Sequence, residues 1–408
     1  MAYSESRIGR IWVREQAAWG TPFTIVPASH AASSVECEIT YPELAQEALS
    51  VDTVRGGFHS APVTAGAKIG TSITLTMPLH GWSAATPSDN ATEHVDALLL
   101  KHALGGSSLA GWSSDVLASG QDSATVIKYG DGSGALNMIG NAVLIPVSGG
   151  HSVGWVTSGN VGGDPDLLTV LNALSANASD SAQPYGSNTC YLTTGMPSVP
   201  LTVQWQGSDA DAGVRLSDGA VTSATITCSP QQQPTLSVTL NFLDWDEVTG
   251  LGSPGLYSHS LPQMPILTGS NDARLVMGSD LHIDAASFEI TIENEMATIG
   301  SHSGNEGASV YYATNRTVTG SLTIPTAAAL GINAPGTDPG ALQLDLAGTP
   351  GNALSILVPE PVLTEVSQIG DNDGLVAETL SFGCNVMLAD ATTGAGAAVN
   401  SPFRVAFL

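Results

Sequence analysis

Short runs that alternate apolar residues with serine or threonine recur along the chain, each bounded by glycine, proline, asparagine or aspartate. In residues 71–79, for example, Ile73, Leu75 and Met77 would face one side of the segment and the hydroxyl residues between them the other. This period of two is typical of half-buried antiparallel strands. It predicts strands at residues 34–40, 71–79, 142–147, 201–205, 221–228, 235–242, 287–292, 317–324, 353–358 and 376–387.

Two segments have helical spacing instead. In residues 92–104, apolar residues and His102 recur every three or four positions, and Gly105 follows as a stop. In residues 166–174, Asp164 would cap the helix and Pro165 would occupy its first position. Strands greatly outnumber helices, and strand and helix do not alternate regularly. The sequence therefore predicts a mainly β fold of antiparallel sheets with short helical insertions.

Residues 243–280 are rich in glycine, serine and proline and indicate a long connection between two halves. The halves show similar patterns in the same order: residues 34–40 and 70–75 correspond to 287–292 and 319–324, and residues 201–205 and 235–242 to 354–358 and 379–386. The similarity favours a duplicated module, although alternating strands also resemble one another by chance. The predicted division is a first module with inserted loops and helices at 1–245, a linker at 246–280 and a second module at 281–408.

Composition narrows the possible functions. The 408 residues include 45 Gly and 23 Pro, and 42% are hydrophobic, which is enough for a large core and argues against both a disordered chain and a helical bundle. Charged residues are only 12%, yet the net charge is -26. With three lysines, Lys68, Lys101 and Lys128, the chain lacks the cations that tight DNA binding needs.

The four cysteines, Cys37, Cys190, Cys228 and Cys384, are widely spaced and include no C-x-x-C pair. They indicate buried or half-buried thiols in strands rather than a zinc module or a disulfide framework. The N-terminal residues lack the apolar core of a signal peptide, and no stretch approaches a membrane span. These features predict a protein made in the cytoplasm that does not contact membranes.

Residues 150–154 match G-x-S-x-G, the nucleophile elbow of serine hydrolases, with Ser152 as the nucleophile. That chemistry needs a strand before the serine and a helix directly after it. Residues 155–163 make a poor helix, so catalysis through Ser152 is the least favoured alternative. The glycine-rich residues 130–134 are better explained as a hairpin tip than as a phosphate loop.

Acidic clusters are the remaining candidates for chemistry. They are Asp209 with Asp211, Asp244 with Asp246 and Glu247, and Asp371 with Asp373. Each could contribute oxygen ligands to Ca²⁺, but none has the spacing of a calcium loop, and 371–374 is more simply a turn between strands. The nine histidines form no H-E-x-x-H or H-x-H pattern. The sequence thus predicts no catalytic residue, no metal site and no cofactor.

The chain resembles the tail tube proteins of long-tailed double-stranded DNA phages over most of its length. Residues 15–21, EQAAWGT, are similar to the E-x-x-x-[WF]-G-T opening of that group, and residues 98–105 to its LL…LG element. Residues 317–322, TVTGSL, and 373–382, DGLVAETLSF, resemble two of its strands. The chain is about twice as long as many such proteins, which agrees with two modules.

The resemblance implies a β-sandwich module whose inner sheet joins those of its neighbours in a closed ring barrel, with rings stacked into a tube that conducts DNA. Two modules in one chain would make the ring a trimer, and one module would make it a hexamer. Long loops at 105–134 and 243–280 would clasp successive rings. An acidic channel wall would repel the phosphates of DNA, so that the DNA passes without specific binding.

The resemblance further implies a virion tail protein, assembled in the host cytoplasm, with tape measure, tail terminator and baseplate proteins as partners. It does not distinguish contractile from non-contractile tails. The acidity of the chain could also reflect a saline environment. The competing class is another virion binding module, such as a tail fibre, decoration or adhesion protein.

Overall fold

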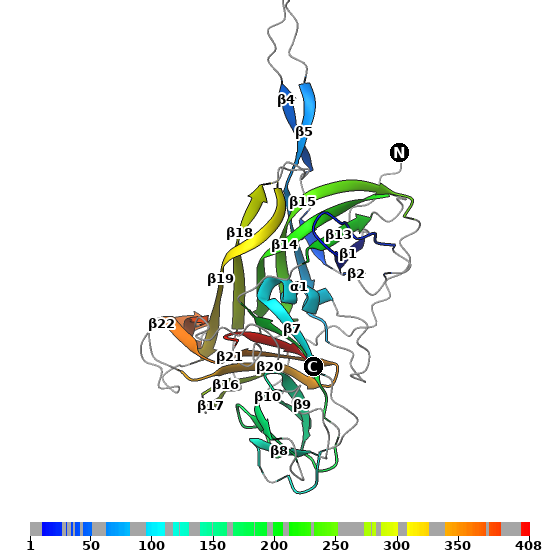
Figure 1. Ribbon diagram of the computed structural model, residues 1–408. Coiled ribbons are helices and arrows are strands. Elements are labelled where there is room, and N and C mark those ends of the chain that lie inside the picture. Colours follow the sequence, from blue (N-terminus) through cyan, green and yellow to red (C-terminus); the bar gives the residue numbers. More distant parts are fainter. Residues whose placement is uncertain are drawn as a thin grey trace, which may run out of the picture.

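The computed structural model consists almost entirely of antiparallel strands, with one helix, α1 (Val95–Leu104), among the residues that it describes (Figure 1). The described residues are 10–26, 30, 34–35, 37–40, 44–50, 63–81, 95–110, 117–121, 123–129, 139–148, 150–160, 166–182, 184–193, 199–206, 212–229, 232–251, 273–278, 280–282, 287–300, 308–325, 339–372, 375–384 and 401–408.

The largest sheet, called the large sheet below, has eleven strands. Its strand β14 is flanked along one side by β15, which leads on to β6 and β3, and along the other side by two separate series of strands. One series is β13-β1-β2 and the other is β18-β19-β23-β22. The bounds are β1 (Arg10–Glu15), β2 (Ser34–Val35), β3 (Glu38–Thr40), β6 (Thr71–Pro78), β13 (Leu201–Gln206), β14 (Ala212–Cys228), β15 (Thr235–Thr249), β18 (Ser287–Gly300), β19 (Ala308–Pro325), β22 (Pro361–Asn372) and β23 (Leu375–Cys384).

Eight of these strands form two groups with the same internal order. The first group runs β3-β6-β15-β14 and the second β18-β19-β23-β22. If the four strands of each group are numbered by their order in the sequence, both groups have the spatial order first, second, fourth, third. The two groups join where β14, the third strand of its group, pairs with β18, the first strand of the next.

A fork in the sheet lies at a bulge between Val221 and Ser223 of β14. Before the bulge the free side of β14 pairs with β13, and after it with β18. At this point Asn294 of β18 donates hydrogen bonds to the carbonyls of Val221 (2.9 Å) and of Ala103 in α1 (3.1 Å). The amide therefore ties the last turn of the helix to the fork.

Arg316 of β19 completes this connection. Its guanidinium donates to Asn294 Oδ1 (2.6 Å) and to the carbonyls of Leu104 (2.7 Å) and Thr193 (2.9 Å). It thus binds the last carbonyl of α1, which also accepts from the amide of Thr193 (3.0 Å), and places a positive charge at the negative end of the helix. Burial lowers the pKa of Arg316 to about 10, so the side chain is still charged at neutral pH.

A seven-stranded sheet packs against the apolar face of the large sheet and shares its main core. Its order is β17-β16-β20-β21-β24-β12-β7, so strands from the second half of the chain are followed by β12 and β7 from the first half. Their bounds are β7 (Gly105–Ala110), β12 (Ser187–Leu192), β16 (Ala273–Met277), β17 (Asp280–His282), β20 (Leu342–Thr349), β21 (Asn352–Val358) and β24 (Arg404–Phe407).

Two smaller sheets complete the fold. Four strands, in the order β8-β11-β10-β9, form a further layer, and β4 pairs only with β5 in a hairpin that projects from the body (Figure 1). Their bounds are β4 (Ala45–Ser50), β5 (Val63–Ile69), β8 (Val126–Tyr129), β9 (Ala142–Val147), β10 (Gly150–Asn160) and β11 (Asp166–Val170).

Nine of the ten strands predicted from the sequence are confirmed, several of them longer than the pattern indicated, and the one at 376–387 is described as far as Cys384. The predicted strand at 34–40 is instead two short strands, β2 and β3, which pair with β1 and β6. Other strands, such as β1, β10 and β22, were not predicted. The helix at 92–104 is confirmed from Val95, but it is buried on almost every side rather than on one stripe. The helix predicted at 166–174 is wrong, because Asp166–Val170 is strand β11. There Leu168 and Val170 are buried, and pairing with β8 and β10 outweighs the helical spacing of the leucines.

The expected linker 246–280 begins and ends in strands, since β15 extends to Thr249 and β16 starts at Ala273. The module boundaries placed there stay a prediction. All four cysteines are free and buried or half-buried, as predicted. Three lie in strands, and Cys37 lies between β2 and β3. No helix in the described part of the chain is long and apolar enough to cross a membrane.

We expect the Arg316→Met substitution to destabilise the protein by about 2–3 kcal/mol, because it removes the hydrogen bonds from a largely buried guanidinium to Asn294 Oδ1 and to the carbonyls of Leu104 and Thr193. Chemical denaturation followed by fluorescence measures the change. Thr317→Ala, at the exposed neighbouring position of β19, is the control and should stay within about 0.5 kcal/mol of the parent. Equal stability of both variants would contradict a structural role for the guanidinium.

Candidate functional site

The two faces of the eight-strand region differ in chemistry. One face carries the buried apolar residues of the main core, such as Leu75, Val238 and Ile292. The opposite face carries mostly serine and threonine, and their hydroxyls lie 3.0–3.3 Å apart in the cross-strand pairs Thr74–Thr239, Thr76–Ser237, Thr225–Thr291 and Thr323–Thr379. We call it the hydroxyl face.

Cross-strand pairing arranges this face in rows. One row crosses all eight strands from the edge at β3 to the edge at β22. Its residues are, in order, Glu38, Thr76, Ser237, Thr225, Thr291, Thr319, Gly383 and Val362. A row that crosses all eight strands makes the hydroxyl face one continuous surface.

Acidic side chains are the charged groups of the hydroxyl face. A second row holds Glu293, between Ser223 and Thr317. A third row contains Glu289 and Glu365, which flank Ser321 and Ser381. Together with Glu38, the three rows carry four carboxylates and neither lysine nor arginine. These rows are therefore negatively charged, as is the chain as a whole.

Both ends of the eight-strand order are open edges. Within the described residues, β3 pairs only with β6, and β22 only with β23. Val362 of β22 is 43% exposed at its edge. An open strand edge presents backbone donors and acceptors to whatever chain comes next. The two edges are therefore candidate sites for pairing with another strand.

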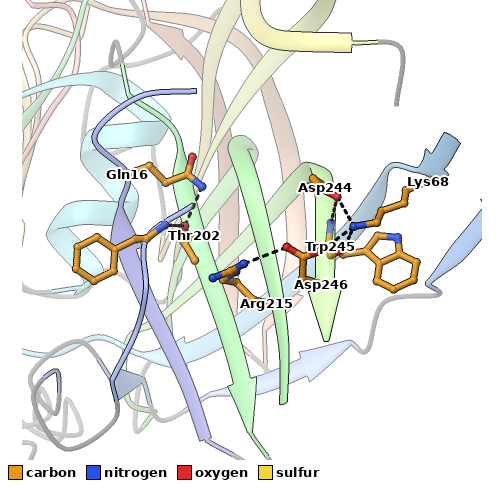
Figure 2. Close-up of polar contacts among 8 residues, drawn as sticks. Gln16, Lys68, Thr202, Arg215, Asp244, Trp245 and Asp246 are labelled. Carbon is orange, nitrogen blue, oxygen red and sulfur yellow. Dashed lines mark hydrogen bonds and ion pairs between the residues drawn. The ribbon is translucent and has the colours of Figure 1, made fainter. Parts of the chain in front are cut away.

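The β4–β5 hairpin is fixed at its base by a cluster of charges. Figure 2 shows Lys68 of β5 reaching Asp244 (2.8 Å) and Asp246 (2.9 Å) of β15, while Arg215 of β14 binds Asp246 from the other side (3.0 Å). The ammonium also donates to the carbonyl of Trp245 and lies 5.1 Å from the centre of its ring.

This cluster shifts the pKa values of its members. Burial disfavours the charge of Lys68, but the two aspartates outweigh that effect and raise its pKa. Burial alone would raise the pKa of Asp246, yet Lys68 and Arg215 lower it overall. Asp244 and Asp246, two members of a predicted acidic cluster, therefore act as an anchor for the hairpin.

A second hairpin, β18–β19, also extends beyond the core. Toward its tip the side chains become exposed, with Ile299 at 52% and Tyr312 at 44%. Trp19 lies edge-on to Tyr311 of this hairpin, with ring centres 6.3 Å apart. The hairpin is thus supported on one side by the N-terminal segment.

The N-terminal segment that resembles the tail tube opening holds several elements together. Glu15 binds His102 (2.9 Å) and Lys101 (3.0 Å) of α1. The hydrogen bond from His102 is the main cause that lowers the pKa of Glu15 to about 2, against the effect of its burial. The amide of Gly20 donates to Asp218 (2.7 Å), which has a left-handed backbone with φ 55°.

Next in this segment, Gln16 hydrogen-bonds with the Thr202 hydroxyl (2.9 Å), which also accepts from the amide of Phe23 (3.1 Å) (Figure 2). The residues of the opening thus have structural contacts, which spacing alone could not reveal.

Ser152 does not lie at a nucleophile elbow. It is inside strand β10, which continues to Asn160 with no helix after the serine. The side chain is 5% exposed, and its hydroxyl accepts hydrogen bonds from the amide of Ser175 (3.1 Å) and from Arg274 (3.0 Å). These contacts explain Ser152 as a structural residue.

The other acidic clusters have simple structural accounts where they are described. Asn372 pairs with Leu375, so β22 and β23 are joined by a two-residue connection, as the predicted turn requires. Asp209, Asp211, Asp373 and the glycine-rich residues 130–134 lie outside the described residues. A search of the described part of the chain found no group of three metal-ligating side chains.

A polar sheet face, open strand edges and projecting hairpins define a class: a structural β protein that makes contacts with other protein chains. Comparison with protein-family models matches residues 6–385 to the phage tail tube proteins. The chain belongs to this family of structural tail proteins. No curated protein sequence matches it.

Membership agrees with the resemblance seen in the sequence. It places the protein in the virion tail, as a component that assembles with itself into a tube and associates with other tail proteins.

We expect Glu15→Gln to change the pH dependence of stability. The folded pKa of Glu15, about 2, is below its ordinary value of 4.5, so its stabilising effect is present above pH 4.5 and is lost as the pH falls towards 2. The variant should therefore melt below the parent at pH 7, and the gap should close by about pH 2. Thermal melts between pH 2 and 7 measure this. With the exposed Glu360→Gln as control, parallel curves for parent and Glu15→Gln would contradict the assignment.

Proposed function

We propose that this protein is the repeating subunit of the tube: copies close into rings, the rings stack, and the hydroxyl face lines the channel through which DNA leaves. The observation that carries the proposal is the repeated strand order of the large sheet, which ends in two open edges.

Ring closure follows from the junction inside one chain. There the third strand of the first group, β14, pairs with the first strand of the second group, β18. The same relation between two copies pairs β22 of one with β3 of the next. Each copy then supplies two equivalent groups, which favours a duplicated module, and three copies give a ring of pseudo-sixfold symmetry. Closure removes both open edges, as in any β-barrel.

The hydroxyl face suits the wall of a DNA channel. Its opposite face is already buried by the seven-stranded sheet, so only the hydroxyl face is available to line a channel. Glu38, Glu289, Glu293 and Glu365 repel phosphates, and the absence of cations from their rows leaves nothing to hold the DNA.

Stacking is assigned to the two projecting hairpins. The clasps expected at 105–134 and 243–280 are partly strand, since β7, β8, β16 and the end of β15 occupy them. The β4–β5 hairpin is anchored through Lys68, and the β18–β19 hairpin exposes Ile299 and Tyr312. A contact between unlike surfaces of successive rings continues indefinitely, as a tube requires.

The finer partners are also part of the proposal: a tape measure protein, a tail terminator and baseplate proteins, with assembly in the host cytoplasm before the tail joins the virion. Electron microscopy of the purified protein tests the central claim. Rings with three copies are expected, alone or stacked, whereas monomers under all conditions would contradict it, and rings of six copies would contradict the duplication.

We expect Val362→Lys to weaken ring formation, because a lysine on an edge strand opposes its pairing with a further strand, here the β3 edge of the next copy. The concentration for half-assembly should rise at least tenfold, which corresponds to about 1.4 kcal/mol. Analytical ultracentrifugation measures it. Leu171→Lys, which also replaces an exposed aliphatic residue but lies away from both edges, is the matched control and should assemble normally.

We expect Glu289→Lys tubes to retain DNA that parent tubes release. A cation repeated in every ring offers many phosphate contacts, so retention should be strong at 50 mM salt and fall steeply by 200 mM. Co-sedimentation of assembled tubes with a short duplex measures it. Glu360→Lys makes the same charge change outside the hydroxyl face. Equal retention by both variants would argue against a channel wall at Glu289.

A further inference from the structure

The four-stranded sheet is an insertion in the seven-stranded sheet. Strands β7 and β12 are direct antiparallel neighbours, with Ala110 opposite Ser187. A hairpin needs about two residues to join such strands. Here residues 111–186 intervene, and they contain β8, β9, β10 and β11. We call residues 111–186 the insert.

The insert has its own core and a defined place. Its strands bury Ile127, Ile145, Val156 and Leu168 against one another in a cluster separate from the main core. Its other face packs, through Leu144, Val153 and Trp155, on residues of β21 and β24. Figure 1 shows β8, β9 and β10 beyond β16, β20 and β21, on the side away from β14 and β15.

Alternation along β21 establishes this layering. Leu354, Ile356 and Val358 face the main core, whereas Ala353 and Leu357 face the insert. The order of layers is therefore hydroxyl face, main core, seven-stranded sheet and insert. The insert is the layer farthest from the hydroxyl face.

Three hydrogen bonds between described side chains join the insert to the seven-stranded sheet, and two of them are buried. Trp155 Nε1 donates to the Ser355 hydroxyl (2.8 Å), and Asn172 Nδ2 donates to Gln343 Oε1 (2.9 Å). The third is the bond from Arg274 to Ser152. Polar groups buried in this way are satisfied only when both layers keep one relative position.

A buried carboxylate connects these groups. Asp345 accepts from Ser355 (2.6 Å) and Gln343 (2.9 Å), and Arg274 lies 3.6 Å away. Burial raises the pKa of Asp345 to about 6. The network links side chains of β16, β20 and β21, so it fixes the insert in a single orientation.

The edges of the insert are not open in the way that β3 and β22 are. The chain covers β8 through a bridge from Leu117 to Tyr129. It covers β9 through bridges from Leu144 to Tyr185 and from Val147 to Ala178. These contacts leave the edge strands poorly suited to pairing with a neighbouring copy.

We propose that the insert is an outer-wall unit: it stands in a fixed orientation on the outside of the tube, and neither ring closure nor stacking requires it. The inference rests on the proposed function, in which the hydroxyl face lines the channel. A protein that surrounds or attaches to the tube at this place would meet the insert before it could reach the seven-stranded sheet.

Labelling of assembled tubes tests the placement. Asn177→Cys puts a thiol on an exposed position of the insert, and Glu289→Cys puts one on the hydroxyl face. A gold-linked maleimide too bulky to enter a channel should label Asn177→Cys in tubes as fast as in unassembled protein, with gold on the outer surface. Labelling of Glu289→Cys should slow at least tenfold on assembly.

The outcomes separate the two proposals. Protection of both positions in tubes would overturn the outer-wall placement while leaving the channel assignment intact. Undiminished labelling of Glu289→Cys would overturn the channel assignment, and the outer-wall unit with it.

A deletion tests whether the insert is dispensable. Residues 111–186 are replaced by Asn-Gly between Ala110 and Ser187, and Leu357→Thr reduces the apolar surface that this uncovers. The variant should form tubes with the parent's axial repeat and a smaller outer diameter.

If the shortened chain does not fold, full-length Trp155→Ala provides the test, because it loosens the insert from the seven-stranded sheet. In assembled tubes its insert should be cleaved by protease at least tenfold faster than in the parent, while the tubes persist. Tubes that fall apart on cleavage, or a folded deletion variant that does not assemble, would overturn the proposal.

Discussion

The pairing of β14 with β18 is the contact on which the rest of the structure depends. It joins the two four-stranded groups into one sheet, and it can form only because β14 changes partners at the bulge after Val221. One side of a strand cannot pair with two neighbours at the same position, so the pairing of β14 with β13 must end before its pairing with β18 starts. Asn294 and Arg316 fill this fork and fasten the end of α1 to it. The continuous apolar face, and with it the seven-stranded sheet, follows from that junction.

The two faces of the large sheet show how few charges such an architecture needs. On one face, apolar residues hold the two sheets together by excluding water. On the other, hydroxyl pairs satisfy one another across strands, so the surface stays polar without cations. Described cations such as Lys68, Arg274 and Arg316 lie elsewhere: at the base of a hairpin, between the outer layers and at the fork. Scarce positive charge is thus used for internal contacts.

Alternation along the sequence was sufficient to predict strands such as β6, because Ile73 and Leu75 have no other way to share one face, but it missed strands such as β1, β10 and β20. It failed at Leu168 and Val170, where leucines at helical spacing form a strand that two neighbours hold in place. The fork could not be predicted, since Arg316 and Leu104 are 212 positions apart. The ion pair of Lys68 with Asp244 could not be predicted for the same reason. Nor could the insert, because nothing in the sequences of β7 and β12 indicates that these two strands pair.

Strand β24 lies in the seven-stranded sheet between β21 and β12, and so unites the last described residues with a strand of the first half. Contacts between such distant segments close large loops before they stabilise anything, and proteins rich in them fold slowly. The two halves of the sequence are therefore interlocked and should reach their native form together. Until they do, the apolar strands that will form the main core stay exposed and can aggregate. The slower the chain folds, the more it needs protection from aggregation during synthesis.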